Sequence, residues 1–174
     1  MKVVIEMLTK RVDYARFRQV YFSEAFNQEL VTAVNLKERT VREHTQLPDG
    51  RERLRTYIAP KVDLPSFIAK LVEGFEIGYE EVTVFDPATR HADVAVHTAG
   101  GDRLHVAAQT QFSEEGDGIR TRIDLEVRVK LLGIGSMIER FMVKETVARY
   151  QVVERELQRF IDAGADRAAD SATV

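Results

Sequence analysis

Glu145 and Arg149 are the residues whose types and spacing most directly suggest chemistry. They lie four residues apart in a long amphipathic stretch, so on a helix they would share one face at the spacing of a favourable ion pair. Steps of about 100° per residue place them on or close to the apolar arc of Ile138, Phe141 and Met142. Because a buried charge is costly unless it is paired, this pattern indicates either a satisfied internal ion pair or a contact with the polar end of a bound molecule.

A second chemical motif is the turn at Gly133 and Gly135, where an apolar strand meets the last predicted helix. A strand, a Gly-x-Gly turn and a helix N-terminus can together cradle a phosphate. A dinucleotide fingerprint, however, needs a third glycine where this chain has Ile138, and it needs a following parallel strand, for which only a short tail remains. We therefore expect the turn to be a compact joint between strand and helix, and we expect no cofactor.

Candidates for catalysis are few. The chain has no cysteine, and it lacks a G-x-S-x-G motif that would expose a nucleophilic serine. His97 and His105 flank a glycine turn, and a three-residue loop would bring their rings opposite each other, whereas a two-residue loop would send them to opposite faces. A metal or acid-base pair therefore stays open as an alternative. No metal-ligand motif accompanies the histidines, so the sequence assigns no catalytic residue and no metal ligand.

Composition limits the classes of function. A formal net charge of -3 with 30% charged residues lacks the basic excess of a protein that binds duplex nucleic acid. The 174 residues fit a single domain with a sizeable core. No segment approaches the ~20 apolar residues of a membrane span, and the N-terminus carries Glu6 inside its apolar run without a small-residue cleavage site. We therefore expect a cytoplasmic protein without a nucleic-acid partner.

Local patterns in the first half of the chain predict the elements that position these residues. Residues 2–10 are rich in β-branched side chains and predict a strand, and Asp13 and Ser23 are N-cap candidates for two short helices. The stretch LPDG at 47–50 predicts the turn of a polar hairpin. Residues 63–74 predict a short helix, with a proline in its first turn and a glycine just past its end.

The middle of the chain predicts a series of antiparallel hairpins. In residues 75–79 the apolar side chains fall on odd positions, whereas at Val82 and Val84 they fall on even positions. One extra residue at Glu80 or Glu81 would produce this change of phase, so the pattern predicts a β-bulge there.

The end of the chain predicts one more strand and a long helix. Apolar and charged side chains alternate through residues 119–131, which indicates a strand with one buried and one wet face. Ser136 and Glu139 match a capping box, and helical periodicity then continues to about Ile161. Residues 163–174 are rich in Ala and Asp and are expected to be a disordered tail.

The order of strand, two short helices, about six strands and a long helix resembles the START-like superfamily, also called SRPBCC, helix-grip or Bet v 1-like. The resemblance covers residues 1–162, which we expect to form one domain. The stretch VRVKLLGIGSMIE, a strand followed by a short glycine turn and a helix start, is most similar to the domain of unknown function 2505 within that superfamily. The resemblance implies an α+β fold, β-α-α-β6-α, in which a curved antiparallel sheet of about seven strands wraps around the C-terminal helix.

The resemblance also implies a cavity between the sheet and the C-terminal helix. The expected function is binding or transport of a hydrophobic small molecule or lipid, without covalent chemistry. Two alternatives are a cyclase- or dehydratase-like enzyme that uses acid-base residues of the cavity, and a protein-interaction module with the same fold. The residues expected to bind the ligand are Met137, Ile138, Phe141, Glu145 and Arg149 on the helix and Phe75, Ile77, Leu125 and Val127 on the sheet.

The polar hairpin offers a possible partner surface. Its basic residues are interspersed with acidic ones, so a mildly basic edge could contact anionic lipid head groups during ligand loading. The interpretation we favour is a solvated edge whose charges prevent strands of other molecules from pairing with it. The basic residues are Lys37, Arg39, Arg42, Arg51, Arg53 and Arg55.

Overall fold

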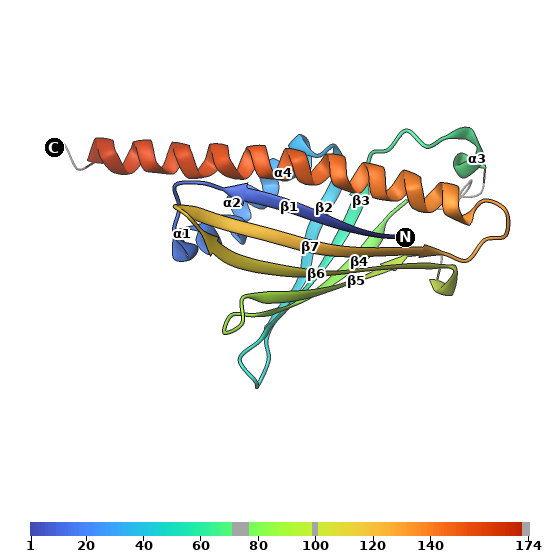
Figure 1. Ribbon diagram of the computed structural model, residues 1–174, viewed down its shortest axis with the longest axis horizontal. Helices are drawn as coiled ribbons and strands as arrows, with labels where there is room; N and C mark the ends of the chain where they lie inside the picture. Colours follow the sequence, from blue (N-terminus) through green and yellow to red (C-terminus); the bar gives the residue numbers. More distant parts are fainter. Residues whose placement is uncertain (71–76, 99–100, 172–174) are drawn as a thin grey trace.

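The computed structural model describes residues 1–70, 77–98 and 101–171, with side chains up to residue 164. Within these residues the chain forms a seven-stranded sheet and a long C-terminal helix that lies along it (Figure 1), as predicted for the α+β helix-grip fold. The elements are β1 (Lys2–Thr9), α1 (Tyr14–Tyr21), α2 (Glu24–Ala33), β2 (Leu36–Gln46), β3 (Glu52–Pro60), α3 (Ser66–Ala69), β4 (Tyr79–Asp86), β5 (His91–Thr98), the 3-10 helix η1 (Gly101–Arg103), β6 (Leu104–Glu115), β7 (Gly118–Val129) and α4 (Gly135–Ser171).

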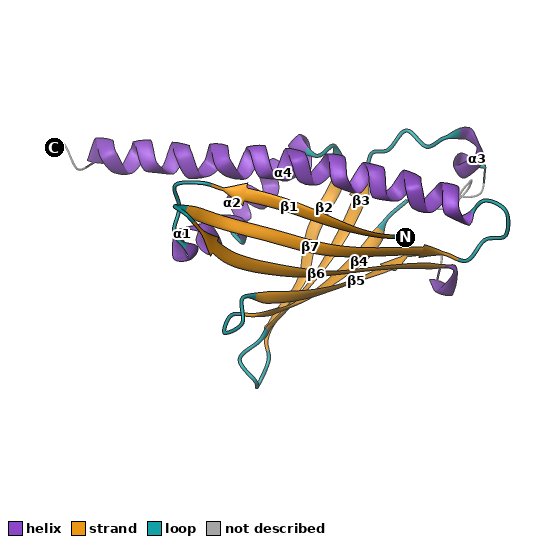
Figure 2. Cartoon of the chain, viewed as in Figure 1, coloured by secondary structure: helices purple, strands orange, loops and turns teal. Residues whose placement is uncertain are grey.

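The strands lie in the order β1-β7-β6-β5-β4-β3-β2, and each described pair is antiparallel. Figure 2 shows that the sheet bends strongly: β1, β7 and β6 run along α4, whereas β2 and β3 run across the direction of the helix. The concave side, called the inner face here, therefore looks toward α4. Helix α4 packs on β1 and β7 and touches α1 and α2, but it makes few contacts with the other strands.

The two short helices begin where their cap residues predict. The carboxylate of Asp13 accepts a hydrogen bond from the backbone N–H of Arg16 at 2.8 Å, and the hydroxyl of Ser23 accepts one from Phe26 N–H at 3.2 Å. Each bond satisfies one of the N–H groups that a helix leaves unpaired at its start. The predicted hairpin is also confirmed, since Gly50 occupies the turn between β2 and β3 with a φ of +86°.

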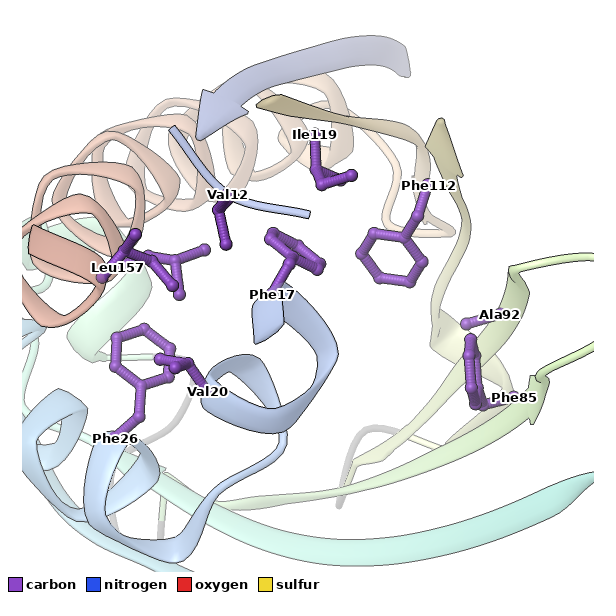
Figure 3. Packing of buried hydrophobic residues seen from close by; sticks show 10 residues of the cluster. Val12, Phe17, Val20, Phe26, Phe85, Ala92, Phe112, Ile119 and Leu157 are labelled. Atoms are coloured by element: carbon purple, nitrogen blue, oxygen red, sulfur yellow. The ribbon is translucent and has the colours of Figure 1, made fainter. Parts of the chain in front are cut away.

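Helices α1 and α2 close one end of the sheet with aromatic side chains. Figure 3 shows Phe17 of α1 between Phe112 of β6 on one side and Val12 and Leu157 on the other. The ring of Phe17 lies 5.5 Å from that of Phe112 and stacks on Tyr21 at 5.4 Å. Rings bury a large apolar area, so this packing fixes the helices to the sheet. The buried members of this aromatic cluster are Val12, Phe17, Val20, Phe26, Phe85, Ala92, Phe112, Ile119, Leu157 and Ile161.

Helix α4 also covers the exposed edge of β1. The backbone N–H of Leu8 donates to the carboxylate of Glu154 at 2.8 Å, and that of Lys10 donates to the side-chain carbonyl of Gln158 at 2.8 Å. These side chains replace the partner that an edge strand lacks. A second cluster lies beneath this part of α4, and its buried members are Ile5, Met7, Ile123, Leu125 and Val127.

The glycine turn is the joint that the sequence predicts. Gly133 has a φ of +81°, a conformation that costs glycine no steric penalty. A Cβ atom at Gly135 would lie 2.5 Å from the carbonyl oxygen of Val129, so this position needs a residue without a side chain. The close approach lets α4 begin directly above the end of β7.

Three details differ from the sequence predictions. The capping box is wrong, because Glu139 turns back to accept a hydrogen bond from Val129 N–H at 2.9 Å. The predicted helix over residues 63–74 is the single turn α3, and residues 71–74 lie outside the described range. Helix α4 continues to Ser171, past the domain end predicted at residue 162. Alanine is the best helix former, so an Ala-rich tail can extend a helix without packing.

Candidate ligand-binding site

Strand β4 carries a carboxylate on the inner face of the sheet. The register of β4 with β3 and β5 is continuous, so the predicted bulge at Glu80 or Glu81 is wrong. Tyr79, Glu81 and Phe85 therefore project inward in one phase, and Phe85 is buried in the aromatic cluster. The valines that suggested a change of phase point to the outer face. In most sheets the apolar side chains of a strand point inward and the charged ones point outward. In β4 a glutamate points inward and two valines point outward, which is why the sequence interpretation missed Glu81.

Arg39 lies on the same inner face, two strands away from β4. Directly opposed residues of antiparallel strands share a face. Arg39 of β2 lies opposite Ile58 of β3, and Ile58 lies opposite Tyr79 of β4. In the adjacent row Glu81 lies between Thr56 of β3 and Val96 of β5. The sheet thus brings a guanidinium, a phenol and a carboxylate to neighbouring positions.

Two tyrosines approach this region from the helices. Tyr21 of α1 packs in the aromatic cluster, and Tyr150 of α4 packs on the second cluster beneath the helix. Burial is the main cause that raises the pKa of Tyr150 well above its ordinary 10.0, and the nearby Tyr21, Glu81 and Tyr79 add to the increase. Electrostatic contact of this kind requires proximity, so α1, α4 and the sheet converge here. We call Tyr21, Arg39, Tyr79, Glu81 and Tyr150 the polar cluster.

The environment of the polar cluster favours uncharged forms. Burial raises the pKa of the Glu81 carboxyl above its ordinary 4.5, whereas Arg39 and a hydrogen bond from Thr83 oppose that increase. Burial likewise raises the pKa of Tyr21 and of Tyr79 to about 12. The phenols therefore keep their protons at neutral pH and act as hydrogen-bond donors or acceptors.

These polar groups have few partners within the protein. The hydroxyl of Thr83 donates to Glu81 at 3.5 Å, a long hydrogen bond. Among the residues that the structure describes, neither the hydroxyls of Tyr79 and Tyr150 nor the guanidinium of Arg39 has a hydrogen-bond or ion-pair partner. The residues are half-buried, and their polar atoms are not sealed from solvent. The cluster is therefore open to a partner from outside the chain.

Apolar residues surround the polar cluster on the inner face. The four on β5 and β6 project inward in register with their neighbours, yet each is only half-buried although it faces α4, and the fifth lies on α4 and is half-buried as well. Solvent therefore reaches the inner face between the aromatic cluster and the row of Tyr79. These residues are Val94, Val96, Val106, Ala108 and Met142.

The structure separates the predicted ligand-binding residues of the sheet. Leu125 and Val127 are buried at 6% and 1% exposure in the cluster beneath α4, where they serve as core. Ile77 is 38% exposed and precedes β4. Phase alone could not distinguish these environments, because core and lining residues look alike in a sequence. Phe75 lies outside the described residues.

The predicted stripe on α4 is rotated from the observed one. Met137 is 39% exposed, whereas Ile138 is buried at 9%. The first turns of α4 carry apolar side chains on several sides, so steps of about 100° per residue do not define a single buried face there. Farther along, the observed stripe passes through Tyr150 and the buried Leu157. Tyr150 was missed because a tyrosine in an amphipathic helix has no distinctive signal.

Phe141, Glu145 and Arg149 are half-buried on the flank of α4 that turns away from β1. The structure contains no ion pair between Glu145 and Arg149. The positive charge of Arg149 instead lowers the pKa of Tyr79, so Arg149 lies near the polar cluster. The two residues thus differ, because the charge of Arg149 acts on Tyr79 of the sheet while Glu145 has no partner among the described residues.

The outer face of the sheet carries the remaining apolar side chains of β4. A depression of about 780 Å³ is lined by Val82, Val84, Ala95 and Ala107 of this face and also by Val94, Ala108 and Leu125, among other residues. His97 and His105 are exposed. Among the described residues no group of histidine, aspartate and glutamate is arranged to hold a metal ion. This face carries no feature comparable with the polar cluster.

The charges of the predicted polar hairpin are largely neutralised by one another. Arg53 binds Glu43, and Arg55 binds Glu80 at 2.9 Å and Glu43 at 3.4 Å. A surface whose cations are paired offers little attraction to anionic lipids. The solvated-edge interpretation therefore fits the structure better, and membrane contact stays a prediction. No helix in the described part of the chain is long and apolar enough to span a membrane.

Comparisons with known proteins place these features in a family. Residues 8–161, which include the whole polar cluster, match the model of a family described as a protein of unknown function, DUF2505. None of the curated proteins matches the chain. Among solved structures, the protein TTHA0849 from Thermus thermophilus has a TM-score of 0.67 at 11% identity, covering 94% of this chain and 99% of that chain.

Two further solved structures share the fold. A START superfamily protein from Mycobacterium smegmatis has a TM-score of 0.52 at 18% identity, covering 92% of this chain and 97% of that chain. The Zhui aromatase/cyclase from Streptomyces sp. R1128 has a TM-score of 0.53 at 15% identity, covering 92% and 94%. At such low identity these likenesses show the fold alone. This chain therefore belongs to the DUF2505 family, and its fold is that of the START-like superfamily.

Proposed function

We propose that the protein binds a small amphipathic molecule in a cavity between the inner face of the sheet and α4. The polar cluster carries this proposal, because it places half-buried hydrogen-bonding groups with few partners among the described residues on a largely apolar surface. The apolar part of the ligand lies along Val94, Val106 and Ala108, and its polar end meets Tyr79 and Glu81. Lipids and other amphipathic metabolites combine an apolar part with a polar end in this way.

The energetic cost of the polar cluster supports a ligand-binding role. Burial of a polar group without a hydrogen bond costs about 1–3 kcal/mol in proteins, and an inward carboxylate costs more. The fold itself does not need Glu81, since an apolar residue at this position would extend the apolar surface that α4 covers. A group that stabilises neither the sheet nor the helix is better explained by the molecule it contacts.

An enzyme of the cyclase or dehydratase kind is the second candidate. One observation favours it, namely a carboxyl group with a raised pKa beside phenols that retain their protons. Such a group can donate a proton to a carbonyl oxygen and later take one back. The name of the aromatase/cyclase with the same fold is consistent with this chemistry, although that likeness concerns only the fold.

Extraction of the purified protein into organic solvent, followed by mass spectrometry, tests the proposal. We expect an amphipathic compound to be enriched with the wild-type protein and depleted from Ala108→Phe, in which a ring occupies the proposed cavity. Absence of any enriched compound from wild-type protein would count against binding. If the compound changes mass during incubation with the protein, the enzyme candidate replaces the carrier.

A further inference from the structure

Most of the polar groups that line the proposed cavity can donate hydrogen bonds, and two of them carry a positive charge. Arg39 projects inward from β2, and Arg149 approaches Tyr79 from α4. Both side chains are half-buried, and among the described residues neither guanidinium has a carboxylate partner. Two other arginines of the hairpin that carries Arg39 differ, because Arg53 and Arg55 form ion pairs with glutamates. The described part of the inner face therefore holds two arginines that form no ion pair.

The remaining groups compensate these cations only in part. Glu81 is the acidic member of the polar cluster, and burial raises the pKa of its carboxyl, although the charge of Arg39 opposes that increase. The hydroxyls of Tyr79 and Tyr150 keep their protons and can donate them in hydrogen bonds. A guanidinium separated from water binds an oxyanion more strongly than a neutral oxygen, because the hydrogen bonds are charge-assisted. The complementary ligand end is therefore an anion that accepts several hydrogen bonds.

We infer that the polar end of the ligand is a carboxylate, held by Arg39 and Arg149 and by the tyrosine hydroxyls, so that the ligand class is a long-chain or ring-bearing organic acid. This inference rests on the proposed function, since it concerns the same cavity. The arginines approach from the sheet and from the helix, and a carboxylate has two oxygens with which to bridge them. A phosphate would satisfy the same donors but carries a larger charge, which is harder to remove from water.

Calorimetric titration with decanoic acid, decanol and decylamine at pH 7.5 tests separately whether the protein binds an amphipathic molecule and whether it prefers a carboxylate. The three probes share one alkyl chain and differ only in the charge of the polar end. We expect the acid to bind about tenfold tighter than the alcohol, and the amine to bind most weakly. Arg39→Gln should remove most of the advantage of the acid while leaving decanol binding unchanged.

Two variants control for folding and for charge alone. Arg42 lies on the same strand as Arg39, but its guanidinium stacks on the ring of Tyr57 and does not line the proposed cavity. Arg42→Gln should therefore leave the affinities for all three probes unchanged. Arg39→Lys retains the charge without the planar fork and should retain part of the preference. Equal affinity for acid and alcohol, or a preference for the amine, overturns the carboxylate inference but leaves the proposed function standing. Failure of all three probes to bind wild-type protein overturns the proposed function itself.

Discussion

Glu81→Gln is expected to raise the free energy of unfolding at pH 7.5 by about 1 kcal/mol, the order of magnitude for relieving an incompletely compensated buried polar group. The wild-type carboxyl has a raised pKa, chiefly because burial disfavours its charged form. At neutral pH the folded protein therefore holds either a desolvated charge or a proton taken from solvent. Glutamine has nearly the same shape and can still accept the bond from Thr83, but it carries no charge.

The pH dependence of stability gives this prediction its sign. A carboxyl whose pKa is higher in the folded state binds more protons folded than unfolded at pH values above about 4.5, the ordinary value. Wild-type stability should therefore fall as the pH rises from 4.5 through the folded-state pKa. The difference between Glu81→Gln and wild type should be negligible below that window and greatest above it. Urea denaturation across pH 4 to 8 measures both curves.

Glu80→Gln is the matched control for this prediction. Glu80 is the adjacent residue, but it lies on the opposite face and binds Arg55 at 2.9 Å. Its replacement should lower stability slightly, by up to about 1 kcal/mol, because it removes the partly exposed ion pairs with Arg55 and Arg42. The two neighbouring substitutions thus have opposite signs. Destabilisation by Glu81→Gln at pH 7.5 would mean that the carboxylate stabilises the fold. The energetic cost of Glu81 would then no longer support a ligand-binding role.

Ala108→Phe is expected to change the free energy of unfolding by less than about 1 kcal/mol, whereas the same substitution at Ala92 should cost about 1–3 kcal/mol or more. Ala92 is 4% exposed within the aromatic cluster and has no room for a ring. Ala108 is half-buried on the inner face between Val94 and Leu125. If the space before Ala108 is a cavity, a phenyl group fills it without displacing other residues.

Ligand binding should respond to these two variants differently from stability. Ala108→Phe should weaken decanoic acid binding by about tenfold or more, since the ring takes the place of the alkyl chain. The Ala92→Phe variant, where it remains folded, should bind normally because its site lies in the packed end of the sheet. Thermal or urea denaturation and calorimetry measure the two effects. A cost at Ala108 equal to that at Ala92 would show that the inner face is ordinary core.

The fold follows from local signals that agree with one another. Asp13 and Ser23 begin the two short helices as their side chains predict, and the alternation in residues 119–131 produces strand β7, which lies between β1 and β6. Gly135 reaches its position because only a residue without Cβ fits against Val129. These features depend on neighbours in sequence or on close backbone contact, which a single sequence can reveal.

The candidate site depends on long-range contacts and was largely missed. Arg39 looked like one more charge of a polar hairpin, and its inward direction follows only from the register of β2 with β3. The valines of β4 point outward and Glu81 points inward, so the apolar residues change phase along the sequence. That change of phase resembles a bulge, although the strand is regular. Arg149 forms no ion pair with its predicted partner Glu145, and its role in a ligand site stays a prediction.

Methyl NMR of the protein titrated with decanoic acid tests the central claim most directly. Val96, Val106 and Met142 project into the proposed cavity, whereas Val82 and Val84 line the depression on the outer face. The account predicts that the signals of the inner methyl groups shift and show contacts to the alkyl chain, while the outer valines stay unchanged. Shifts confined to Val82 and Val84 would place the ligand on the outer surface and contradict a binding site between the sheet and α4.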